Sequence, residues 1–156
     1  MRICEAEARA KTGAASPGAQ AKTDAACMRL HKLATASRTA IEVTDRSSLG
    51  ITFRNFPLGS CGDASLLVGH YLKAHGFAVT YVLGERGQRH DDWTSHAWLR
   101  VHGFIVDVTA DQFPEVEQAV LVARESPWHD TFEVEDEHDG DFVIYDAATA
   151  MNLQRI

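Results

Sequence analysis

Three residues, Cys61, His96 and Asp107, are of the types that together carry out nucleophilic catalysis. A cysteine thiolate attacks a carbonyl carbon, a histidine moves the proton, and a carboxylate holds the histidine in place. We expect Cys61 to act as nucleophile, His96 as general base and acid, and Asp107 as the residue that orients His96. The prediction requires elements that bring these three side chains together.

Cys61 stands at the start of the clearest predicted helix, which follows Ser60 and ends near Gly76. Ser60 and Asp63 have the spacing of a capping box, and Gly76 suits a helix end. The free N–H groups and the positive dipole end of a helix N-terminus favour a thiolate. We therefore expect the pKa of Cys61 to be low. Apolar residues recur along this helix at helical spacing, at Ala64, Leu67, Val68, Tyr71 and Leu72.

Two alternating apolar runs around a glycine turn predict a β-hairpin over residues 94–109. When Val101 pairs with Phe104, the register places His96 and Asp107 on the same face as diagonal neighbours. An acid in an apolar strand needs a partner, and His96 is in position to supply it. The opposite face then carries six apolar residues, which are Ala97, Leu99, Val101, Phe104, Val106 and Val108.

The segments around the three residues resemble a known family. The segments are Phe56-Pro57-Leu58-Gly59-Ser60-Cys61-Gly62-Asp63-Ala64-Ser65, Ser95-His96-Ala97-Trp98 and Val106-Asp107-Val108-Thr109. Their order looks like the Cys, His and Asp layout of the transglutaminase-like branch of the papain-like cysteine protease superfamily. The resemblance implies an α+β fold, in which a helix bearing the cysteine packs on an antiparallel β-sheet. It also implies acyl transfer through a thioester on Cys61.

Further candidates for the site rest on residue type alone. Gln112 and Asn55 are candidate side-chain donors to the oxyanion, beside the backbone N–H of Cys61. Trp98 is interpreted either as a wall of the substrate cleft or as a packing residue.

The composition narrows the choice of partners. Acidic residues outnumber basic ones by 22 to 15, and the formal net charge is −7. This charge argues against nucleic acid and against an anionic membrane surface as partners. We expect a peptide or protein substrate, with basic substrates favoured by the acidic segment 133–141, which is predicted as a solvated loop. The small, odd number of cysteines predicts free thiols and a cytoplasmic protein.

The length of 156 residues indicates one domain. We expect a flexible N-terminal segment over residues 1–23 and a single transglutaminase-like domain over residues 24–156. The predicted elements outside the site are a helix over 24–38, a strand from Ile41, a strand over 77–83, a strand over 119–123, a strand over 142–145 and a final helix over 147–153.

The sequence thus predicts a cysteine-dependent hydrolase or acyltransferase that acts on an amide without cofactor or metal. Two alternatives remain open. One is a non-catalytic binding module on the same fold. The other is a zinc site formed by Cys61, His96 and Asp107, with His90 or His129 as the fourth ligand.

Overall fold

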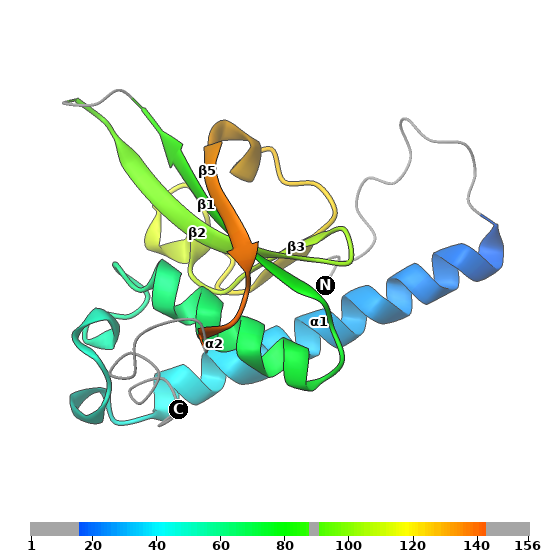
Figure 1. Ribbon diagram of the computed structural model, residues 1–156, viewed down its shortest axis with the longest axis horizontal. Coiled ribbons are helices and arrows are strands. Elements are labelled where there is room, and N and C mark those ends of the chain that lie inside the picture. The colour runs from blue at the N-terminus through cyan, green and yellow to red at the C-terminus, as the bar shows by residue number, and fades with distance from the viewer. Residues whose placement is uncertain (1–15, 88–90, 143–156) are drawn as a thin grey trace.

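The computed structural model describes residues 16–87 and 91–142, which form an α+β fold (Figure 1). Five strands make one antiparallel sheet in the order β4-β3-β2-β1-β5. The two α-helices of the described part are α1 (Pro17–Val43) and α2 (Cys61–Ala74). The strands are β1 (Val79–Arg86), β2 (Thr94–Val101), β3 (Phe104–Asp107), β4 (Leu121–Ala123) and β5 (Glu133–Asp139).

The sheet has the predicted hairpin register. Val101 pairs with Phe104 and Leu99 pairs with Val106, as the alternation of apolar residues requires. All six apolar residues of the hairpin belong to the main hydrophobic core, which they form together with residues of α1 and α2. Both helices contact the sheet, α2 at β1 and β2 and α1 at β3 and β4. The predicted packing of the cysteine-bearing helix on an antiparallel sheet is confirmed.

A smaller hydrophobic cluster lies on the other face of the sheet. Its buried members are Val82, Trp98 and Phe132, and Ile105, Phe113 and Trp128 pack against it. His96 and Asp107 belong to the alternate positions of the hairpin, so their side chains lie on this aromatic face.

Helix α1 is longer than the sequence indicated. It starts at Pro17, so residues 17–23 of the predicted flexible segment are helical. The strand expected from Ile41 is wrong, because Ile41 is fully buried on the last turns of this helix. Buried apolar residues of α1 lie three, four and seven positions apart, at Cys27, Leu30, Ala34 and Ile41, and Ser37 and Arg38 are buried between the last two. This spacing is typical of the buried face of an amphipathic helix.

The acidic segment is a strand rather than a loop. Residues Glu133–Asp139 form β5 at the edge of the sheet, paired antiparallel with β1. Only one edge of its backbone is paired. Charged side chains on such an edge strand oppose pairing with a further strand. The strand predicted over residues 119–123 is confirmed in its second part, as β4 (Leu121–Ala123). Phe142 is buried outside any strand, and residues 143–153 of the last two predicted elements lie outside the described residues.

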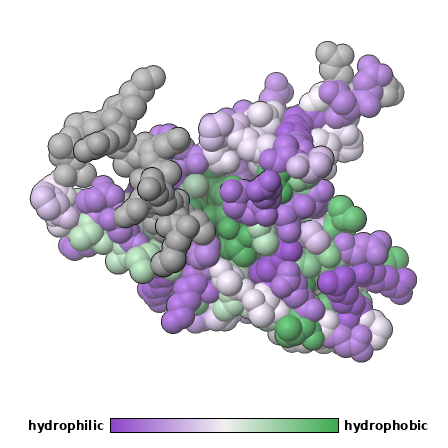
Figure 2. All heavy atoms as spheres, turned by 180° about the vertical axis from the view of Figure 1, so that it is seen from behind, coloured by the Kyte–Doolittle hydropathy of each residue, from purple (hydrophilic) through white to green (hydrophobic). Residues whose placement is uncertain are grey.

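One face of the described surface is mostly polar (Figure 2). Figure 2 shows this face, where hydrophilic side chains surround a smaller apolar area near its centre. Within residues 16–87 and 91–142, no helix has the length and apolar character that a membrane span requires.

Candidate functional site

The start of α2 fixes the position of Cys61. The Ser60 side chain does not cap the helix, so the predicted capping box is wrong. Its Oγ instead donates a hydrogen bond of 2.6 Å to the Thr52 carbonyl oxygen. The Thr52 hydroxyl in turn donates to the Asp63 carboxylate. These two bonds tie the first turn of α2 to the loop that precedes it.

A buried hydrogen bond joins α2 to β2 one turn beyond Cys61. The Ser65 hydroxyl donates to the Ala97 carbonyl oxygen over 3.2 Å. Cys61 itself is half-buried at the start of the same helix. The helix start is therefore held against the strand that carries His96.

His96 and Asp107 form the pair that the hairpin register predicts. His96 Nε2 lies 2.6 Å from Asp107 Oδ2, and both side chains are fully buried. Since a carboxylate only accepts hydrogen bonds, Nε2 carries the proton and donates it. The other ring nitrogen, Nδ1, is then the one available to Cys61.

The Asp107 carboxylate accepts hydrogen bonds on both oxygens. Thr109 donates to Oδ1 from its backbone N–H at 2.8 Å and from its hydroxyl at 3.2 Å. His129 Nε2 lies 3.0 Å from Oδ2, the oxygen that also binds His96. Burial opposes the charged form, but the His96 charge and the two histidine hydrogen bonds hold the pKa of Asp107 well below its usual range.

The same contacts shift the other two groups of the predicted triad. Burial alone would lower the pKa of His96, but the Asp107 charge and hydrogen bond, together with Cys61, raise it to about 9. Burial alone would raise the pKa of Cys61, but His96 and the Ala97 backbone lower it below the ordinary thiol value. These directions favour a thiolate next to an imidazolium.

Gln112 lies at the site through hydrogen bonds of its side chain, whereas no such bond places Asn55 there. Gln112 Oε1 accepts a hydrogen bond of 3.2 Å from the Gly59 N–H, and Nε2 donates to the Thr109 carbonyl oxygen at 3.0 Å. These two bonds assign the amide orientation, and they place Nε2 3.4 Å from His96 Nδ1. Asn55 is exposed, and its side chain makes no hydrogen bond to the described part of the chain.

Trp98 has the environment of a packing residue. It is 2% exposed, and its ring packs edge-on against His129 and Phe132 at centroid distances of 5.0 and 5.8 Å. Its indole N–H finds no hydrogen-bond partner among the described residues. The Trp98 side chain therefore packs against the buried histidines and does not line an open cleft.

His129 was expected only as an optional zinc ligand, and its contact with Asp107 was not predicted. His129 begins a short 3₁₀ helix, His129–Thr131, far along the chain from the hairpin. No local sequence pattern links the two positions, so the contact could not be predicted.

The predicted zinc set is only partly brought together. One side-chain atom each of His96, Asp107 and His129 lies within 4.8 Å of the other two, and Cys61 is outside this cluster. His90 lies outside the described residues. Both histidine Nε2 atoms are already within hydrogen-bond distance of Asp107 Oδ2, so the cluster is satisfied as a hydrogen-bonded network.

The cysteines differ in state. Cys61 is a free cysteine, whereas Cys27 is disulfide-bonded. The expectation of free thiols is therefore wrong for Cys27. Disulfides are uncommon in the cytosol, so the cytoplasmic prediction loses the support that it drew from free thiols.

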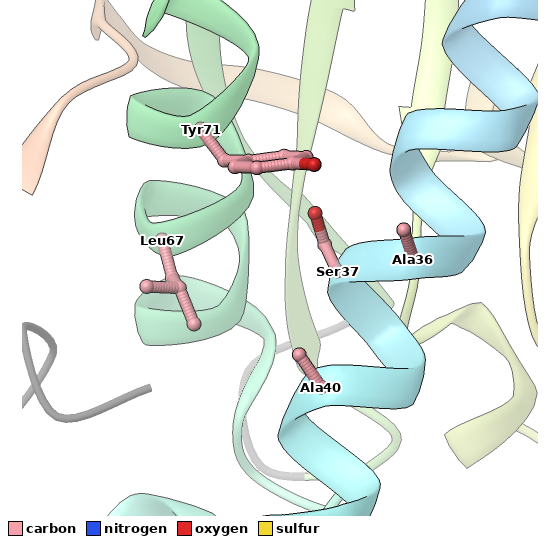
Figure 3. Close-up of a pocket in the computed structure, with 5 residues that line it drawn as sticks. All are labelled: Ala36, Ser37, Ala40, Leu67 and Tyr71. Atoms are coloured by element: carbon pink, nitrogen blue, oxygen red, sulfur yellow. The ribbon is translucent and has the colours of Figure 1, made fainter.

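A separate pocket of about 160 Å³ lies between α1 and α2. It is lined by Ala36, Ser37 and Ala40 of α1 and by Leu67 and Tyr71 of α2. Figure 3 shows the Tyr71 ring pointing toward Ser37 across the space between the two helices. None of the predicted catalytic residues lines this pocket.

Comparison of the chain with protein-family models, with curated proteins and with solved structures finds no match.

Proposed function

We propose that the protein is a cysteine-dependent hydrolase or acyltransferase of the transglutaminase-like, papain-like type, acting on amide bonds through Cys61, His96 and Asp107. One observation carries the proposal. The His96 ring is held by the buried Asp107 carboxylate at 2.6 Å through Nε2, and His96 lowers the pKa of the Cys61 thiol. These are the groups, with the charges, that a Cys–His–Asp triad needs.

The proposed reaction begins with attack of the Cys61 thiolate on the amide carbonyl carbon. The backbone N–H of Cys61, at the first turn of α2, donates to the oxyanion. His96 Nδ1 gives its proton to the leaving amine as the C–N bond breaks, which leaves a thioester on Cys61. Water or an amine then attacks the thioester and loses its proton to His96, and the thiolate leaves with the electrons of the C–S bond.

Gln112 is the favoured side-chain donor near this reaction centre. It bridges the loop before Cys61 and the turn after Asp107, and its amide Nε2 faces His96 Nδ1. Asn55 is not favoured for this role, because it is exposed and its side chain makes no hydrogen bond to the described part of the chain.

The proposed substrates are peptides or side-chain amides. Basic substrates are favoured by the net charge of −7 and by the exposed acidic residues of β5. The binding module and the zinc site remain the alternatives. Metal analysis of the purified protein distinguishes the zinc site from the thiolate mechanism, because only the zinc site requires a stoichiometric metal.

The proposal is tested with p-nitrophenyl acetate, an activated ester that acylates nucleophilic thiols. We expect a burst of p-nitrophenol with one acetyl group per chain, located on Cys61 by peptide mass spectrometry. Cys61→Ser and His96→Ala should abolish the burst. An equal burst in His96→Ala, or none in the wild type, would contradict the proposal and favour a binding module.

A further inference from the structure

We infer that His129, held in place by Ser126, is a positioning residue that fixes Asp107 for its contact with His96. The inference rests on the proposed function, because it assigns a supporting group to the proposed triad. It starts from a second buried histidine on the carboxylate oxygen that already holds His96.

The contacts with Asp107 and Ser126 fix the tautomer and the orientation of the His129 ring. The Ser126 hydroxyl lies 2.7 Å from His129 Nδ1, and His129 Nε2 lies 3.0 Å from Asp107 Oδ2. Because the carboxylate is an acceptor, Nε2 must be the donor and Nδ1 the acceptor from the hydroxyl. The ring is thus fixed in one tautomer and one orientation.

This arrangement holds the Asp107 carboxylate at both ends. Thr109 binds Oδ1 from its backbone and its side chain, and His129 binds Oδ2. A carboxylate held on both oxygens cannot rotate without breaking a buried hydrogen bond, which is unfavourable because it leaves a buried polar group unpaired. Oδ2 is therefore kept where His96 Nε2 meets it.

The contact order Ser126, His129, Asp107 has the form of a Ser–His–Asp triad, but its burial does not suit a second catalytic centre. Ser126 is 5% exposed and His129 is 3% exposed, so a substrate has no room at the hydroxyl. The Ser126 oxygen also lies 3.4 Å from the backbone N of His129, as in a local turn. We therefore assign His129 the role of supporting the neighbouring pair of Asp107 and His96.

The ionisable groups near His129 come from several elements. Cys61 belongs to α2, His96 to β2 and Asp107 to β3. From β1, the Arg86 guanidinium lies 5.4 Å from the ring centroid of Trp128, the neighbour of His129. Arg86 is paired with Glu115, so its charge is balanced outside the aromatic cluster.

The test compares His129→Leu with His129→Gln. Glutamine retains a side-chain N–H that can donate to Asp107, whereas leucine removes it. We expect the iodoacetamide alkylation rate of Cys61 near pH 6 to fall about tenfold in His129→Leu. A loss of this size is typical when a hydrogen bond that orients a functional residue is removed. The rate in His129→Gln should stay close to the wild-type rate. Thermal unfolding of both variants reports any loss of stability separately.

The inference is overturned if both variants react at the wild-type rate while His96→Ala still abolishes the fast reaction. If the alkylation rate of Cys61 is the same in the wild type and in His96→Ala, the proposed function is overturned, and the inference with it. If His129→Leu does not fold, Ser126→Ala takes its place, because it removes only the hydroxyl that fixes the ring. A shifted pH profile of alkylation in Ser126→Ala supports the inference, and an unchanged profile overturns it.

Discussion

Asp107 has the most demanding environment of any single residue in the proposed site. Its side chain is fully buried and accepts hydrogen bonds from His96, His129 and Thr109. A buried carboxylate is tolerated when its oxygens are occupied by donors in this way. Asp107 therefore determines both the stability of the aromatic face and the orientation of His96.

Removal of this carboxylate should destabilise the fold. We expect Asp107→Ala to lower the free energy of unfolding by about 3–5 kcal/mol, because it leaves buried histidine donors without a partner. Urea denaturation at neutral pH measures the change. Asp130→Ala is the control, since Asp130 is exposed and its expected effect is within about 0.5 kcal/mol. An equal effect of the two substitutions would contradict the role assigned to Asp107.

The pKa of His96 predicts how stability depends on pH. The folded protein holds the His96 proton up to about pH 9, whereas an unfolded histidine loses it near about 6.5. A raised pKa contributes stability that is complete below the unfolded value and lost as pH rises toward the folded value. The lowered pKa of Cys61 acts in the opposite direction, so the effect is measured in Cys61→Ala.

In Cys61→Ala the Asp107 charge and hydrogen bond still raise the pKa of His96, so we expect the free energy of unfolding to fall as pH rises above about 6.5. The double variant Cys61→Ala/His96→Gln, which retains an N–H donor but does not titrate, should lose this slope. Urea denaturation across the range gives both curves. Parallel curves would show that His96 does not hold its proton in the fold.

Helix α2 is positioned by a close backbone approach at its middle. A Cβ at Gly69 would lie 2.0 Å from the carbonyl oxygen of Gly140, the residue after β5. No side chain fits between the backbone of α2 at Gly69 and the backbone at Gly140. The two backbones can therefore approach this closely only because residue 69 is a glycine. The same helix carries Cys61 at its start.

Gly69→Ala should therefore displace α2 or Gly140. We expect a loss of about 3 kcal/mol in the free energy of unfolding, at the upper end for overpacking. Gly18→Ala is the matched control, because nothing lies within 4 Å of its Cβ position and alanine favours a helix. A tolerated Gly69→Ala with unchanged Cys61 alkylation would contradict this placement of α2.

Among the elements, the spacing of apolar residues predicted the hairpin and helix α2, but not strand β5. The alternation around His102-Gly103 gave the observed register, and with it the His96–Asp107 contact. The period of apolar residues gave α2, with Cys61 at its start. The strand β5 could not be predicted in this way, because its residues are mostly exposed and its structure depends on pairing with β1.

Across the whole molecule, Arg38 links the first helix to the segments that carry the site. Its buried guanidinium donates to the carbonyl oxygens of Val108 and Ala119 and to the Asp111 carboxylate. Asp111 immediately precedes Gln112 in the chain. Helix α1 is therefore connected through one side chain to both ends of the β3–β4 connection.

This link is not evident from the sequence, where Arg38 is one of 15 basic residues and the helix around it has a weak apolar pattern. The contact of His129 with Asp107 was missed for the same reason, since both depend on the path of the chain after β3. Long-range contacts of this kind follow from the packed fold and not from spacing.

Arg38→Ala should lower the free energy of unfolding by about 2–4 kcal/mol, because it leaves the two carbonyl groups and Asp111 without their donor. Arg38→Lys should not restore the loss, since an ammonium group cannot reproduce the fork of the guanidinium. Arg46→Ala, at an exposed arginine, is the control. Chemical denaturation gives all three values, and equal effects at Arg38 and Arg46 would contradict the role of Arg38.

Activation of Cys61 by His96 is the step on which the proposed mechanism depends, and the pH dependence of Cys61 alkylation reports it. Iodoacetamide labelling is followed by peptide mass spectrometry in the wild type and in His96→Ala. We predict fast alkylation of Cys61 below about pH 7 in the wild type, because the pKa of the thiol is lowered, and loss of this low-pH reaction in His96→Ala. A Cys61 that titrates near about 8.5, or is inert in both proteins, would contradict this activation.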